Sequence, residues 1–144
     1  MPRGYPDYFG QQMFPKYGAL KSISDYHSSS GSGEKTLVNI NGKGIVFGGR
    51  IWVLSSDARN YDIIRMYIDG ESSFSMAMSH MNLYDVDYNS QLPIFLIYYD
   101  ELNPRYEIGI RSGITFDSNF KLTYYQSNPT AFSIFYDFYY TLIQ

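Results

Sequence analysis

The stretch Phe132-Ser-Ile-Phe-Tyr-Asp-Phe-Tyr-Tyr-Thr-Leu-Ile143, near the end of the chain, decides the fold. Apolar residues occupy every second position: Phe132, Ile134, Tyr136, Phe138, Tyr140 and Leu142. Because successive side chains of a strand point to opposite faces, this period of two predicts a β-strand with one buried face. Phe135 and Tyr139 then lie on the outer face, between Ser133, Asp137 and Thr141. We expect a second sheet, the N-terminal segment or another subunit to cover these two aromatic residues, which makes them candidate interface residues.

Several earlier segments are also typical of strands. Residues 105–111 and 120–125 alternate in the same way, and Tyr106, Ile108 and Leu122 are expected in the core. Further strands are expected at 36–41, 45–54, 62–68, 94–99 and, with an irregular exit, 72–86. No amphipathic helix separates these segments, which disfavours a parallel sheet. The sequence therefore predicts an all-β fold, an antiparallel β-sandwich in the form of an eight-stranded jelly roll.

Paired turn residues punctuate these strands. Asn41-Gly42 is a strong tight-turn dipeptide, and it predicts that 36–41 and 45–54 form a hairpin. Asp69-Gly70 is a second turn signal at the end of a strand. Gly48-Gly49 lies inside a strand, where glycine indicates a bulge or a close approach of another backbone.

The beginning of the chain differs in composition from the rest. Residues 1–27 contain three prolines and three glycines, which break periodic structure, yet they are too rich in aromatic side chains for an ordinary disordered tail. Residues 28–35 have the Ser/Gly composition of a flexible linker. We therefore expect an extended arm over 1–27, a linker over 28–35 and the sandwich over 36–144. The arm residues expected to bind a partner are Tyr5, Tyr8, Phe9, Phe14 and Tyr17.

Composition excludes several classes of protein. The 144 residues carry a formal net charge of −3, without the clustered Lys and Arg that neutralise phosphates, so we expect no nucleic-acid partner. The absence of cysteine excludes disulfides, thiolate metal sites and cysteine nucleophiles. No apolar run approaches the roughly 20 residues that span a bilayer, and the opening residues do not resemble a secretory signal. We expect a protein that is made in the cytoplasm and does not span a membrane.

Residues with reactive side chains form no recognisable catalytic motif. The two histidines, His27 and His80, are far apart in the sequence, and no nucleophile motif accompanies either of them. Asp85 and Asp87 could provide alternate oxygen ligands for calcium, but they do not belong to a complete calcium-binding loop, and the sequence leaves this question open. We expect no catalytic residue, no cofactor and no metal.

A family resemblance adds to these observations. The segments that carry it are Pro2–Gly10, Phe14–Gly18, Tyr67–Glu71, Gly113–Phe116 and Ser118–Tyr124. They are similar to segments of small structural proteins of tailed viruses (bacteriophages). The resemblance implies a β-sandwich that serves as a capsid decoration, head fibre or tail component. It also implies a homo-oligomer, such as a trimer or a larger ring, that attaches to the particle through extended arms.

Three functional hypotheses follow from the sequence. The first is a non-enzymatic virion structural protein that is made in the host cytoplasm and whose arm binds other virion proteins or a neighbouring subunit. The second is a carbohydrate-binding or receptor-binding adhesin module, with exposed aromatic residues in a groove beside Asn82, Asn89 and Gln91 that bind a host glycan or receptor. The third is a small hydrolase that uses carboxylates such as Glu71 or Glu101.

Overall fold

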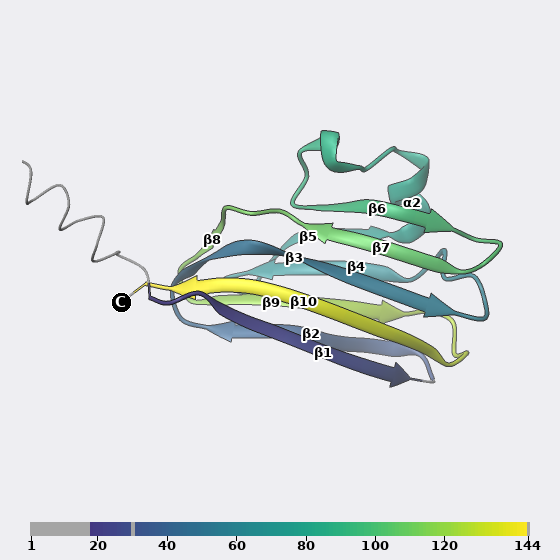
Figure 1. Ribbon diagram of the computed structural model, residues 1–144, viewed down its shortest axis with the longest axis horizontal. Helices are drawn as coiled ribbons and strands as arrows, with labels where there is room; N and C mark the ends of the chain where they lie inside the picture. The colour runs from purple at the N-terminus through teal and green to yellow at the C-terminus, as the bar shows by residue number, and fades with distance from the viewer. Residues whose placement is uncertain (1–17, 30, 144) are drawn as a thin grey trace, which may run out of the picture.

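Two antiparallel β-sheets packed face to face make up the fold (Figure 1). The computed structural model describes residues 18–29 and 31–143. The larger sheet has the strand order β1 (Lys21–Ser29), β10 (Phe132–Leu142), β3 (Gly44–Ser55), β7 (Arg105–Ile110) and β6 (Ile94–Asp100), and β8 (Ile114–Phe116) pairs with β3. The smaller sheet has the order β2 (Gly33–Asn41), β9 (Asn119–Gln126), β4 (Ile63–Ile68) and β5 (Glu71–Ala77). Two short helices, α2 (Met78–Leu83) and η1 (Tyr88–Ser90), follow β5.

Strand pairing follows a nested order. β1 pairs with β10, β2 with β9, β3 with β7 and β4 with β5, so the first half of the chain pairs with the second half in reverse. Rolling such a ladder into two sheets gives a jelly roll, which confirms the predicted all-β antiparallel sandwich. The eight strands of the roll are not the eight expected ones. The roll includes β1, which was not expected, and the expected strand at 94–99, β6, is an addition to the larger sheet, as is the short strand β8.

The two sheets include residues that were expected to belong to the arm and the linker. Residues 21–29 form β1, which pairs along its whole length with β10, and β2 already begins at Gly33. Gly31 and Gly33 adopt φ values of 88° and 134° just before β2 and at its start, a conformation that favours glycine. The sequence of β1 lacks alternating apolar residues, because Ile23 is its only described residue that packs against the core. The strand was therefore not predicted. Backbone hydrogen bonds to β10 define this edge strand.

Two other local predictions meet different outcomes. The Asn41-Gly42 turn forms, but β2 and β3 lie in different sheets, so the predicted hairpin is wrong. A turn signal shows that the chain reverses and leaves open which strand it then pairs with. The segment 72–86 is a strand followed by a short helix, β5 and then α2, in agreement with the expected irregular exit.

The core lies between the two sheets, where the alternating residues were predicted to meet. Tyr106, Ile108 and Leu122 have no exposed surface. Phe120 on β9 stacks on Phe138 on β10, with ring centroids 5.1 Å apart. These contacts between the sheets fix which side of each strand faces outward.

A buried ion pair closes one end of the sandwich. The Arg59 guanidinium lies 3.6 Å from the Asp62 carboxylate, and neither side chain has exposed surface. Arg59 also donates a hydrogen bond to the carbonyl of Asn128 and stacks over the Phe132 ring. The Tyr124 hydroxyl donates to Asp62 over 2.5 Å, and burial raises the pKa of this tyrosine well above its ordinary value. The loops at this end of the sandwich are therefore held by charge-assisted hydrogen bonds inside the protein.

A carboxylate joins two turns at the opposite end. Asp69 and Gly70 form the β4–β5 turn with φ values of 54° and 84°. The Asp69 carboxylate accepts hydrogen bonds from the backbone N–H groups of Ser118, Asn119 and Asp117. The bonds from the backbone of Ser118 and then Asn119 are the largest causes of a fall in the pKa of Asp69 to about 2.

The helices of the described residues, α2 and η1, have neither the length nor the apolar character that crossing a membrane requires. Both are a few residues long and join strands of the two sheets.

We expect an Ile108→Asp substitution to prevent folding. Burying an unpaired carboxylate costs several kcal/mol, which is a large part of the roughly 5–15 kcal/mol that stabilises an ordinary domain. Thermal melting followed by circular dichroism measures the effect. Thr115→Asp, on an exposed position of β8, is the control and should melt like the parent protein. Normal melting of the Ile108 variant would contradict the assigned inner face.

We expect Asp69→Asn to lower the melting temperature at pH 7, because an amide accepts the backbone hydrogen bonds less strongly than a carboxylate. The pKa of Asp69 lies near 2 in the folded protein and near 3.8 when unperturbed, so its charge stabilises the fold above about pH 4. This contribution disappears as the pH falls toward 2. The difference in melting temperature between parent and variant should therefore shrink over that range. Asp117→Asn, which changes an exposed neighbouring carboxylate, serves as the control.

Candidate binding surface

Aromatic side chains form a row across the outer face of the larger sheet. Strand register places Tyr26, Phe135, Trp52, Glu107 and Tyr98 side by side, on β1, β10, β3, β7 and β6. Side chains directly opposite on neighbouring strands share one face and touch. The rings of Tyr26 and Phe135 lie 4.5 Å apart, and both side chains are exposed to solvent. The outer face therefore presents an aromatic strip across β1, β10 and β3, which Glu107 separates from Tyr98.

The next row along the strands is more polar. It places Ser24, Asp137, Arg50, Gly109 and Phe95 side by side. The Asp137 carboxylate accepts a hydrogen bond from the Ser24 hydroxyl over 2.6 Å. Arg50 is exposed, and its guanidinium carbon lies 5.5 Å from the centre of the Trp52 ring. Among the described residues its guanidinium forms no ion pair.

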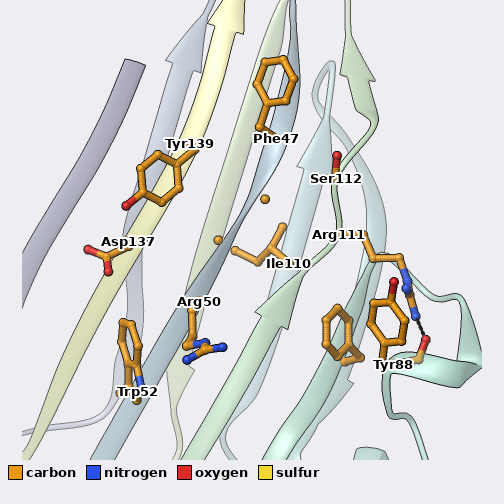
Figure 2. A pocket seen from close by; sticks show the side chains of 12 residues that line it. Phe47, Arg50, Trp52, Tyr88, Ile110, Arg111, Ser112, Asp137 and Tyr139 are labelled. Atoms are coloured by element: carbon orange, nitrogen blue, oxygen red, sulfur yellow. Dashed lines mark hydrogen bonds between the residues drawn. The ribbon is translucent and has the colours of Figure 1, made fainter. Parts of the chain in front are cut away.

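Glycines make this face concave. A Cβ atom on Gly109 would lie 2.4 Å from the Phe95 ring, so the ring rests directly on the backbone of β7. Gly48 has a φ of 127°, which favours glycine, and lies where the register between β3 and β10 shifts. The predicted bulge at Gly48-Gly49 is thereby confirmed. Gly48 and Gly49 line a hollow that lies between Tyr139 on one side and Tyr88 on the other (Figure 2).

Two adjoining hollows form a continuous depression that we call the outer groove. The first has a volume of about 580 Å³ and the second about 670 Å³. Trp52 and Asp137 line both, which makes them continuous. The side chains that define its walls are Tyr26, Phe47, Arg50, Trp52, Phe135 and Tyr139. The groove runs along the sheet from Tyr139 to Leu54 and Arg105.

Arginine side chains hold the rim of the groove in place. Arg111 donates hydrogen bonds to the carbonyls of Leu92 and Tyr88 and lies over the rings of Tyr88 and Phe95, 4.6 and 4.8 Å from their centres. Tyr88 packs edge-on against Phe95 at 5.5 Å. Since guanidinium groups stack well on aromatic faces, this cluster fixes the loop after α2 against the sheet. One wall of the groove is therefore rigid.

The structure brings some of the predicted interface residues to this surface. Phe135 and Tyr139 both line the outer groove, with 40% and 41% of their surface exposed, and their role as an interface stays a prediction. The predicted arm residues Tyr5, Tyr8, Phe9, Phe14 and Tyr17 lie outside the described residues. Sequence reasoning missed Tyr26 and Trp52. The buried alternation of Ile51 and Val53 is the signal that could have placed Trp52 on the outer face.

The candidate residues for carboxylate chemistry do not converge. Glu71 follows the β4–β5 turn, at the end where Ile68 pairs with Phe120. Glu101 lies at the opposite end, where it accepts a hydrogen bond from Tyr99 over 2.5 Å. Paired-carboxylate catalysis requires both groups at one cleft, so these two cannot act together.

Other predicted polar residues lie away from the outer groove. Asp87 accepts a hydrogen bond from the backbone of Asn89 over 2.9 Å and caps η1. Within residues 18–29 and 31–143, no group of three acidic or histidine side chains is placed to hold a metal ion. Asn82, Asn89 and Gln91, expected beside an aromatic groove, are not among the residues that line this one.

Comparison with known proteins gives likenesses in structure alone. No protein-family model matches the chain, and no curated protein matches its sequence. The chain is similar to a protein in the capsid asymmetric unit of cyanophage Pam1, with 12% identity, coverage of 90% of this chain and 89% of the other, and a TM-score of 0.48. It is also similar to VP2 in a subviral particle of infectious bursal disease virus, with 14% identity and a TM-score of 0.29. That alignment covers 87% of this chain and 41% of VP2.

We expect Gly109→Ala to destabilise the protein by about 1–3 kcal/mol, because the new methyl group must displace the Phe95 ring. Chemical denaturation of the single variants and of the double variant Gly109→Ala/Phe95→Ala measures this coupling. Once the Phe95 ring is removed, the cost of adding the methyl group should largely disappear. An equal cost in both backgrounds would show that the ring does not rest on Gly109.

Proposed function

We propose that this chain is a non-enzymatic structural protein of a virus particle that binds other virion proteins or further copies of itself. The outer groove is the observation that carries this proposal. Its walls contain Trp52, Tyr26 and Phe135 together with arginine, and among the described residues no lysine lines either hollow. Tyr, Trp and Arg are enriched in protein interfaces and at their energetic centres, whereas Lys is depleted there.

The exposed apolar side chains support association with another protein. Phe47, Phe135, Tyr139 and Leu54 each leave between 40% and 48% of their surface exposed on neighbouring strands of one sheet. Contiguous apolar surface of this kind usually marks an interaction site on a protein. A binding partner that covers the groove would remove this surface from water.

The sequence resemblance to structural proteins of tailed viruses supports the same role. Two of the similar segments, Tyr67–Glu71 and Ser118–Tyr124, are joined at one end of the sandwich, where Asp69 accepts hydrogen bonds from Ser118 and Asn119. The resemblance therefore falls on residues that build the fold. Under this proposal the protein is made in the host cytoplasm, becomes part of the virion as a decoration, fibre or tail component, and attaches through the residues that precede β1.

The proposal predicts that the chain is a stoichiometric part of purified particles. Quantitative mass spectrometry of particles from the encoding virus should detect it beside the other particle proteins. The double variant Phe135→Ser/Tyr139→Ser should be incorporated at least about tenfold less, since interface aromatic residues commonly contribute 2 kcal/mol or more. Thr115→Ser, exposed on β8 and outside the groove, should be incorporated normally.

Melting curves would first establish that both variants fold. Recovery of the chain only from the soluble fraction of infected cells, and not from particles, would contradict a virion role. Normal incorporation of the Phe135/Tyr139 double variant would remove the outer groove from the attachment.

A further inference from the structure

We infer that the outer groove of one copy receives residues 1–17 of a neighbouring copy. This inference rests on the proposed function, because it names the partner and the surface for a segment already proposed to make attachments. It requires a groove suited to an extended peptide, a segment of matching chemistry, and a geometry that directs the segment away from its own groove.

The groove has the features of an extended-peptide site. It follows the strands of the sheet, and aromatic pairs lie on both sides, Tyr26 with Phe135 and Tyr88 with Phe95. Grooves lined by aromatic rings bind proline-containing segments, whose extended conformation is already formed in solution. The exposed Arg50 can donate hydrogen bonds from the groove floor to the carbonyl groups of such a segment.

The sequence before β1 matches these features. Pro2, Pro6 and Pro15 lack N–H groups that would otherwise need partners, and each disfavours a helical backbone at the residue before it. The five aromatic residues of the segment are Tyr5, Tyr8, Phe9, Phe14 and Tyr17. Their rings can enter the hollow lined by Gly48 and Gly49 and the adjoining hollow, where they would cover Phe135 and Trp52.

The path of the chain favours a neighbouring copy. Gly18 donates a backbone hydrogen bond to Leu142 over 2.6 Å, and Lys21 pairs with Tyr140. β1 then runs along β10 from this end to the other (Figure 1). Gly18, the first described residue, therefore lies at the Leu142 end, and the groove extends from that end along β10 and β3. Binding to its own groove would require the chain to reverse where it is held to β10.

The length of the segment is sufficient for this contact. Seventeen residues span up to about 56 Å when extended at roughly 3.3 Å per residue, whereas an 11-residue strand such as β10 covers about 36 Å. The contact joins two different surfaces, the N-terminal segment and the outer groove. Repetition of such a heterologous contact closes into a ring when the rotation between copies permits.

Photo-crosslinking of the full chain tests the inference. Phe9 is replaced by benzoylphenylalanine, chains labelled with ¹⁴N and ¹⁵N are mixed before assembly, and crosslinked peptides are identified by mass spectrometry. We expect crosslinks from position 9 to residues 48–52 or 132–139, with pairs that join light and heavy chains. Crosslinks confined to single chains, or to surfaces outside the groove, would overturn the inference.

The single tryptophan provides an independent measurement, because Trp52 lines the groove. In the full-length variant Tyr5→Ser/Tyr8→Ser/Phe9→Ser/Phe14→Ser, we expect loss of the oligomer by light scattering and a shift of Trp52 emission to longer wavelength. A synthetic peptide of residues 1–17 should reverse the emission shift, and the same peptide with the four serines should not. A parent chain that is monomeric, or an unchanged Trp52 emission in the variant, would also overturn the inference.

These results are separable from the proposed function. A variant that no longer enters particles, while crosslinks from position 9 avoid the groove, would leave the virion role standing and exclude the groove as the docking site. Crosslinks in the groove of a chain that is not found in particles would support the contact between copies and contradict the virion role.

Discussion

The stacking of aromatic rings between the two sheets is the interaction on which the rest of the structure depends. Phe120 stacks on Phe138 and Tyr124 on Phe132, with centroid separations of 5.1 and 5.4 Å. Both pairs join β9 of the smaller sheet to β10 of the larger sheet. Large buried rings contribute more to a core than most side chains, so these contacts set the inward face of β10. The period of two then requires Phe135 to point outward.

Buried polar groups hold the loops at one end of the sandwich. Arg59 and Asp62 are fully buried, which would be costly if either lost its partners. Asp62 accepts from both the backbone and the side chain of Ser127, while Arg59 binds the carbonyl of Asn128. The two loops at this end therefore depend on one network. Asp69 performs the corresponding task for the turns at the other end, without being buried.

The outer groove arises from the same constraints. The sheet must be covered on its inner face, but its outer face is free to vary, and here it carries aromatic residues on most strands and glycines on β3 and β7. Gly109 admits the Phe95 ring, and Arg111 holds that ring from above. The result is a firm surface rich in Trp, Tyr, Phe and Arg. Such a surface suits recognition of a polypeptide. The proposed function therefore depends on a surface made of many side chains and not on one reactive side chain.

The sequence by itself determined the local features of this protein. It determined the strand character of β7, β9 and β10, the inward position of Ile108 and Leu122, and the Asp69-Gly70 turn, because the period of two and turn chemistry are properties of adjacent residues. Only the tertiary structure decided that β2 and β3 lie in different sheets and that Lys21–Ser29 is a strand. It also decided that Tyr26 and Trp52 lie on either side of Phe135. The physical reason is that strand pairing is non-local: Ser24 meets Asp137 across 113 positions, through backbone and side-chain hydrogen bonds that leave no periodic pattern in the sequence.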